Sequence, residues 1–137
     1  MVIALRNGHL DDVDAVLALW RRAEAEPTHT DDPESLALLI GHDPDALIVA
    51  EEEGELVATV VAGWDGWRGS IYRLVVAPSH RRQGLAARLV DRAEERLRIA
   101  GASRLQAIVV ANASDAVNFW ASTRWERQAP RLRFVRG

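Results

Sequence analysis

The chain has 137 residues, of which 48% are hydrophobic and 27% charged, and its formal net charge is −3. These values predict a single globular domain over residues 1–137, long enough to bury a core. Cysteine is absent, which excludes disulfides, thiolate metal sites and a cysteine nucleophile. No apolar run or leader pattern predicts a membrane partner or export, so we expect a cytoplasmic protein.

The first half of the chain predicts one strand, two helices and a β-meander. After the first strand and its turn, apolar residues at helical spacing predict the first helix, and Pro27 ends it. The pair Asp32-Pro33 suits the cap and first residue of the second helix, which closes at Gly41. Three antiparallel strands then follow, joined by glycine-containing turns. The first strand is expected over residues 2–6 and the first helix over residues 10–25. The three strands of the meander are expected over residues 47–51, 55–64 and 70–76.

The second half predicts a long amphipathic helix between two parallel strands. The helix covers residues 83–100, with Gly101 as its C-cap residue. The strand after it, over residues 104–110, is nearly continuously apolar at its end and is expected to be central. A helix over residues 114–122 and an alternating strand over residues 131–136 follow. The fold class is therefore α/β with a mixed (α+β) sheet, helices on both faces and the order βααβββαβαβ.

The junction between residues 74 and 86 reads as a strand, a proline-marked turn and a glycine bend that opens the long helix. Such a junction directs backbone N–H groups toward one point at the positive end of a helix dipole, which favours an anion. Gly84 allows a close approach of the backbone, and Arg81, Arg82 or Arg88 would pair with phosphates. The expected ligand is a phosphorylated cofactor, although neither GxxxxGK[ST] nor GxGxxG is present.

The element order and this junction resemble the GNAT superfamily of N-acetyltransferases over nearly the whole chain. Arg81, Gly84 and Ala86 fall on the Q/R-x-x-G-x-G/A positions of that family's acetyl-CoA motif, and residues 63–70 with Tyr72 resemble its small YpeA-like branch. The resemblance implies a GNAT-like fold and an acetyltransferase that moves the acetyl group of acetyl-CoA to a primary amine. The alternative is an acyl-CoA-binding module with weak or no transferase activity.

The resemblance also implies a set of residues that bind acetyl-CoA, contributed by a strand end, a helix start and a loop. The strand backbone would bond the pantetheine arm and polarise the thioester carbonyl. No pair of histidines has ligand spacing on one element, so no metal is expected. The expected binding set is Leu74, Val75, Val76, Arg81, Arg82, Gln83, Gly84, Leu85, Ala86, Ala87, Arg88 and Asn112.

The catalytic acid is less well defined by the resemblance. Family members often carry a tyrosine in an A-x-x-F/L-Y arrangement, where this chain has Trp120, whose indole donates a hydrogen bond but is no acid. Arg124 also stands where a glycine is usual. The leaving thiolate would take its proton from water or from Tyr72, or the chemistry would be weak. Alternation along the strand predicts that Tyr72 shares one face with residues 74 and 76.

The acceptor is expected to be a small-molecule or peptide amine, and charge suggests a cationic one. Residues 1–55 carry a formal −11 and residues 56–137 a formal +8, so a cation would be steered toward the first half. Candidate bases are Glu51, Glu52, Asp65 and His29, each with the alternative of a solvated surface group. The negative net charge and the lack of a recognition-helix pattern argue against nucleic acid. Exposed tryptophans and the arginine-rich final strand would suit a homodimer.

Overall fold

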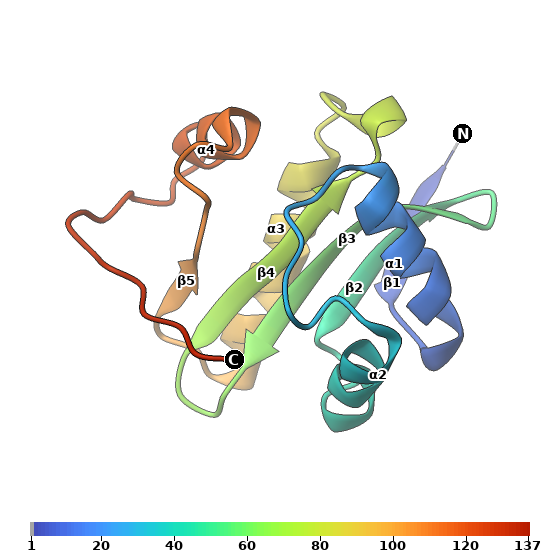
Figure 1. The fold of residues 1–137 in the computed structure, drawn as a ribbon, viewed down its shortest axis with the longest axis horizontal. Helices are drawn as coiled ribbons and strands as arrows, with labels where there is room; N and C mark the ends of the chain where they lie inside the picture. The colour runs from blue at the N-terminus through green and yellow to red at the C-terminus, as the bar shows by residue number, and fades with distance from the viewer. Residues whose placement is uncertain (1) are drawn as a thin grey trace. The chain divides into compact units, whose positions relative to one another are not determined.

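A five-stranded mixed sheet lies between helices in the computed structural model, which describes residues 2–137 (Figure 1). The strand order is β1-β2-β3-β4-β5, with antiparallel pairing throughout except between β4 and β5, which are parallel as predicted. The strands are β1 (Ile3–Asn7), β2 (Leu47–Glu52), β3 (Glu55–Trp64), β4 (Gly69–Val76) and β5 (Leu105–Ala107).

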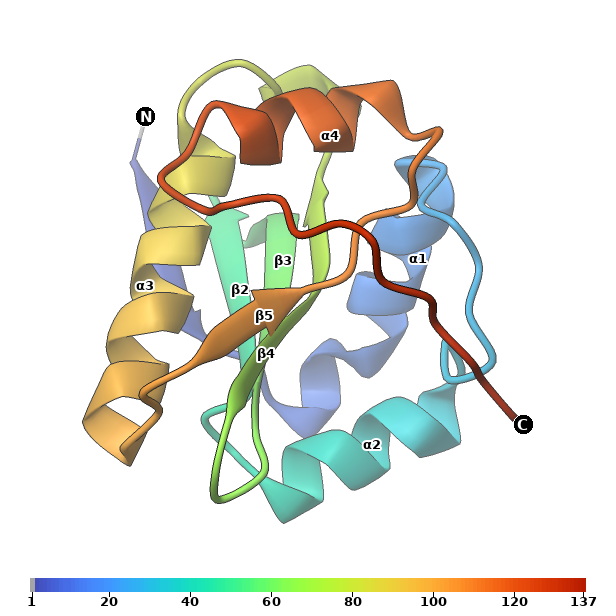
Figure 2. The same ribbon diagram turned by 90° about the vertical axis from the view of Figure 1, so that its left-hand side faces the viewer.

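Helices cover both faces of this sheet. Helices α1 (Val13–Arg22) and α2 (Pro33–His42) lie on one face, and α3 (Leu85–Ala100) lies on the other (Figures 1 and 2). Strand β3 is buried over its whole stretch from residue 56 to residue 62 because both faces are covered there. The predicted α/β architecture is therefore confirmed, with β3 as its central strand. Within residues 2–137, every helix is too short or too polar to cross a bilayer.

The helix ends follow the local signals of the sequence. The carboxylate of Asp32 accepts a hydrogen bond from the backbone N–H of Ser35 at 2.7 Å, which caps α2 and lowers the pKa of that carboxyl. Gly101 ends α3 with a φ of 119°, as predicted. Helix α1 stops at Arg22, earlier than expected, and Glu24 then takes a left-handed φ of 55°. The first turn before α1 is a separate 3-10 segment over Leu10–Asp12.

The chain forms two compact units, one ending at Ala107 and the other covering Ile108–Gly137. The second unit contains α4 (Ser114–Ala121), which confirms the predicted helix. Its segment from residue 131 to residue 136 has no regular structure, so the prediction of a final strand there is wrong. Leu132 and Phe134 are 85% and 90% exposed. Alternation indicates a strand only where a neighbouring strand supplies hydrogen bonds, and none pairs with this segment within residues 2–137.

The strand predicted over residues 104–110 is shorter than expected and is not central. Strand β5 pairs only with the first residues of β4, through Gly69 to Ile71, and it forms the edge of the sheet. The apolar residues that suggested a central strand, Ile108 and Val110, lie beyond this pairing and are 57% and 43% exposed. The continuous apolar run therefore predicted burial wrongly, because these residues lie outside the paired part of the strand.

Candidate active site

Strand β4 contains a β-bulge that decides which of its side chains share a face. Residues 73 and 74 of β4 together oppose only Val60 of β3, because residue 72 pairs with residue 61 and residue 75 with residue 59. Arg73 is the inserted residue and takes a φ of 50°, a left-handed conformation that favours glycine. The two halves of the strand are therefore out of phase by one residue.

The bulge corrects the prediction that Tyr72, Leu74 and Val76 share one face. Tyr72 pairs with residue 61 and Val76 with residue 58 of β3, and residues three apart on a strand point to opposite faces. Tyr72 instead shares a face with Thr59, whose hydroxyl accepts a hydrogen bond from the indole N–H of Trp20 in α1 at 2.9 Å. Tyr72 therefore lies on the face of the sheet that α1 and α2 cover.

The ring of Tyr72 lies over a glycine of the neighbouring strand. Its Cε2 atom is 3.1 Å from the position that a Cβ would take at Gly63 of β3, so no larger residue fits there without a shift. The side chain is still 49% exposed. Tyr72 is thus fixed by packing on one side and accessible on the other, as a proton donor to a bound ligand needs to be.

The outer edge of β4 is unpaired by β5 beyond Ile71. The strand continues for five residues past that point, to Val76. Part of this edge is used internally, because the carbonyl of Val76 accepts a hydrogen bond from Nε of Arg81 at 3.3 Å. This stretch contains the three residues, Leu74, Val75 and Val76, that the sequence assigned to the pantetheine arm.

The start of α3 has the geometry of an anion cradle. Arg82 and Gly84 both take left-handed φ values, 63° and 77°. Left-handed residues occur in the backbone turns, called nests, that bind anions through their N–H groups. No side chain within residues 2–137 caps the helix, so the N–H groups at its first positions, Leu85 to Ala87, lack intrahelical partners. A Cβ built on Gly84 meets no atom within 4 Å, which leaves the space above the helix end open. The start of α3 therefore has free N–H groups and open space at the same place.

The arginines of this segment differ in their availability. Arg81 donates to the carbonyls of Val76 and Ala23, at 3.3 and 3.2 Å, and so joins the ends of β4 and α1. Arg88 donates to the carbonyl of Ile3 at 3.2 Å. Arg82 is exposed, and within residues 2–137 no bond of these kinds ties its side chain to the protein. Among the predicted phosphate-binding arginines, Arg82 is therefore the one that would reach a ligand most readily.

The side chains of the remaining predicted binding residues divide by exposure. Leu85 is buried at 3%, so only its backbone can face the cradle. Gln83 and Ala87 are exposed, and Ala86 is half-buried.

The three acidic residues considered as catalytic bases all make structural bonds. Glu51 accepts from Arg6 at 3.3 Å, and Glu52 bonds Nε2 of His80 at 3.2 Å. Asp65 accepts from the backbone N–H groups of Arg68 and residue 67, which lowers the pKa of its carboxyl. These bonds give each acid a role in holding a turn or a strand end. His29, the other candidate, is exposed in the loop between α1 and α2.

Two predicted site residues, Asn112 and Trp120, belong to the second unit. Trp120 makes edge-to-face contacts with Phe119 and Trp125, with ring centroids 5.3 and 4.8 Å apart. Trp120 is therefore part of an aromatic cluster within this unit. Asn112 is exposed in the turn before α4.

Arg73 is a functional candidate that the sequence reasoning missed. Its guanidinium lies 4.5 Å from the centre of the Trp20 ring and donates to the carbonyl of Glu26 at 2.9 Å and to the carboxylate of Asp31 at 2.7 Å. Burial lowers the pKa of Arg73, and the charge of Asp31 opposes that effect. The sequence signal that could have identified Arg73 is that it is the one charged residue of the predicted strand over residues 70–76.

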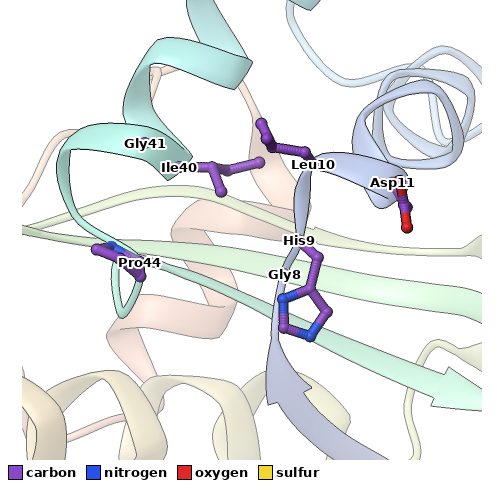
Figure 3. A pocket seen from close by; sticks show the side chains of 7 residues that line it. All are labelled: Gly8, His9, Leu10, Asp11, Ile40, Gly41 and Pro44. Atoms are coloured by element: carbon purple, nitrogen blue, oxygen red, sulfur yellow. The ribbon is translucent and has the colours of Figure 1, made fainter.

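A shallow hollow of about 400 Å³ lies between the end of β1 and the end of α2 in the first unit (Figure 3). It adjoins the end of β1, where the N–H of Gly8 donates to the carbonyl of Leu47, the first residue of β2. Strands β2 and β4 run in the same direction, and the cradle follows the last residue of β4. The hollow is thus at the opposite end of the sheet, along the strand direction, from the cradle. It is lined by Gly8, His9, Leu10, Asp11, Ile40, Gly41 and Pro44.

Solved structures of N-acetyltransferases share this fold. PaiA N-acetyltransferase of Thermoplasma acidophilum, solved with coenzyme A, matches with a TM-score of 0.75 over 88% of this chain and 87% of its own, at 14% identity. Diaminobutyrate acetyltransferase EctA of Paenibacillus lautus, solved with L-2,4-diaminobutyric acid and coenzyme A, matches with a TM-score of 0.73 over 88% and 73%, at 21% identity. The fold is therefore that of an acetyltransferase.

Sequence comparison gives the family. The profile of the Acetyltransferase (GNAT) family matches residues 13–123. An acetyltransferase of Pectobacterium atrosepticum is 38% identical over 107 residues, which cover 78% of this chain and 75% of that protein. The chain belongs to the GNAT family and is an N-acetyltransferase. Within residues 2–137, no three histidine, aspartate or glutamate side chains gather as a metal site would require.

Proposed function

We propose that the protein moves the acetyl group of acetyl-CoA to a primary amine by direct attack on the thioester. The observation that carries this proposal is the uncapped start of α3, with open space above Gly84, directly after the unpaired edge of β4. A pyrophosphate suits the cradle, and an extended pantetheine arm suits a strand edge. Coenzyme A in the solved structures of PaiA and EctA supports the assignment.

The acyl donor supplies an acetyl group activated as a thioester. The amine loses a proton, its nitrogen bonds to the acetyl carbon, the carbon–sulfur bond breaks, and the thiolate takes up a proton. The backbone of Leu74–Val76 would bind the arm and polarise the carbonyl, and Arg82 would pair with phosphate.

Tyr72 is the side chain proposed to protonate the thiolate. It lies on β4 two residues before the proposed carbonyl-binding stretch, and it is half-exposed. Trp120 occupies the position where the family often has a tyrosine, but an indole N–H supplies no proton at neutral pH. Its two edge-to-face ring contacts fit a packing role. The replacement of the family tyrosine by Trp120 is the reason for the second candidate function, an acyl-CoA-binding module with weak or no transfer.

Calorimetric titration of the purified chain with acetyl-CoA and with free coenzyme A is the test of this function. We expect binding of both in the micromolar range, followed by acetylation of at least one compound in a screen of primary amines that includes diaminobutyrate. Absence of binding by the folded protein would contradict the proposal. Binding without acetylation of any amine would favour the second candidate function.

The acceptor is proposed to be a cationic amine, with attraction from exposed acids of the loop between α1 and α2. Asp31 pairs with Arg73 and Asp32 caps α2, so neither is available, whereas the carboxylates of Glu24 and Glu26 are exposed. We expect a Glu24→Gln, Glu26→Gln variant to raise the acceptor KM about threefold at low salt, with less effect at high salt.

The matched control for charge removal is an Asp91→Asn, Glu95→Gln variant, which takes two exposed acids from α3 on the other face. It is expected to leave the acceptor KM unchanged. Equal effects in the two variants, or none in the loop variant, would contradict steering by the loop.

A further inference from the structure

We propose that Arg73 is a positioning residue that fastens the loop between α1 and α2 to the bulge of β4 and thereby shapes the acceptor side of the site. The inference rests on the proposed amine acetyltransfer. Arg73 contacts the loop and the sheet, and it acts on the acceptor only through the loop. Three sets of contacts carry the inference.

The first set fixes the backbone of Arg73. A non-glycine residue at a φ of 50° is strained and persists only where its surroundings impose it. Thr59 of β3 is fully buried, and its hydroxyl donates to the carbonyl of Arg73 at 3.1 Å while accepting from the indole of Trp20 at 2.9 Å. The bulge is thus bonded to the central strand and, through Trp20, to α1.

The second set fixes the guanidinium. It stacks 4.5 Å from the centre of the Trp20 ring, and its two terminal nitrogens donate to the carbonyl of Glu26 and the carboxylate of Asp31. The side chains of Arg73 and Asp31 are only 16% and 17% exposed, so solvent screens this pair less than a surface pair. The Nε atom is buried without a hydrogen-bond partner within residues 2–137, so this side-chain position is held by the other contacts.

The third set carries the connection into the loop. Asp31 accepts from the backbone N–H of Thr28 at 3.0 Å and from its hydroxyl at 2.7 Å, and the N–H of Asp31 donates to the carbonyl of Thr28 at 3.2 Å. The same carboxylate therefore closes a turn and binds Arg73. The guanidinium holds the loop at two separate points, Glu26 and Asp31, with this turn between them.

The position of the bulge connects the loop to the proposed chemistry. Because the inserted residue breaks the alternation, Tyr72 and Arg73 both face α1 although they are adjacent in sequence. The loop is consequently held on the face that presents Tyr72. If the loop is already ordered, acceptor binding does not have to offset the entropy cost of ordering it. Arg73 would therefore favour acceptor binding without any contact to the acyl donor.

The test compares Arg73→Met and Arg73→Lys with the wild-type protein. Arg96→Met is the matched control, because Arg96 also donates to one carboxylate and one carbonyl, those of Asp43 and Asp45, at the other end of the sheet. Amide hydrogen exchange of residues 25–32, the acetyl-CoA Kd and the steady-state constants for the acceptor are measured on each. Asp31→Asn cuts the same connection from the loop side, which keeps the test available if Arg73→Met does not fold.

We expect Arg73→Met to speed exchange of residues 25–32 and to raise the acceptor KM about tenfold, with kcat and the acetyl-CoA Kd changed less than twofold. Arg73→Lys keeps the charge but loses the planar fork, so it should recover only part of the KM. Arg96→Met should match the wild type in all three measurements. Loop exchange unchanged by Arg73→Met and Asp31→Asn, or an equal loss in kcat and KM, would overturn the inference.

Failure of the proposed function gives a different result. If the wild type acetylates no amine, the transferase proposal fails, whereas hydrogen exchange still decides whether Arg73 holds the loop. If the wild type acetylates an amine and the variants keep its KM, the transferase proposal stands and the role of Arg73 is wrong.

Discussion

Gly84→Glu is expected to weaken acetyl-CoA binding at least about 100-fold, which corresponds to about 2.7 kcal/mol. The new side chain would fill the open space above the start of α3, where a Cβ at Gly84 now meets nothing within 4 Å. Its negative charge would repel a phosphate from the unpaired N–H groups of the helix end. The measurement is calorimetric titration with acetyl-CoA, and Arg82→Glu added to the same chain should lower the affinity further.

Gly66→Glu is the matched control for this substitution. Gly66 has a similar left-handed φ, 89° against 77°, and a Cβ there also meets no atom within 4 Å. It lies in the turn between β3 and β4, at the end of the sheet opposite the cradle. Both variants therefore carry comparable backbone strain and one added charge. Equal losses of affinity in the two variants would show that strain, and not the cradle, accounts for the effect.

Tyr72→Phe is expected to lower kcat about 100-fold while the acetyl-CoA Kd stays within twofold, since a positioned proton donor contributes about 10²- to 10⁴-fold. Phenylalanine retains the ring that packs over Gly63, so the fold should be unaffected. The kcat deficit should shrink when acetyl-CoA is replaced by its selenium analogue, because a selenolate is a weaker base than a thiolate and leaves more readily without a proton. The measurement is steady-state kinetics with both donors.

The alternative sources of the proton give distinct results. An unchanged kcat in Tyr72→Phe would contradict the role of Tyr72 and leave water as the proton source. A higher kcat in Trp120→Tyr would show that the family position in α4 still reaches the thiolate. A deficit that is the same with both donors would assign Tyr72 to some step other than departure of the thiolate.

Elements controlled by local signals were predictable from sequence. The cap at Asp32, the end of α3 at Gly101 and the glycine-opened start of that helix depend on residues a few positions apart, and the structure has all three. The final strand over residues 131–136 failed because alternation describes a face and says nothing of a partner strand. The strand after α3 failed as a central strand for the same reason, since only three of its residues find partners.

The candidate site was predictable where it depends on backbone and was missed where it depends on tertiary contact. The motif from Arg81 to Ala86 identified the cradle, although the side chain of Arg81 turned out to bind carbonyls of the protein itself. No glycine in the sequence marks the bulge at Arg73. It is imposed by Thr59 and by a loop more than forty positions away in the sequence, at Asp31.

The bulge also determines how β4 should be varied in a library for new acceptors. Before residue 73, the side chains facing α1 are those of Ser70 and Tyr72, and after it the face continues at Val75. A library that followed simple alternation through residues 70, 72, 74 and 76 would cross to the α3 face halfway along the strand. Half of the varied positions would then disturb the packing of α3. The failure of those variants would be mistaken for evidence that the acceptor side of the site tolerates no change.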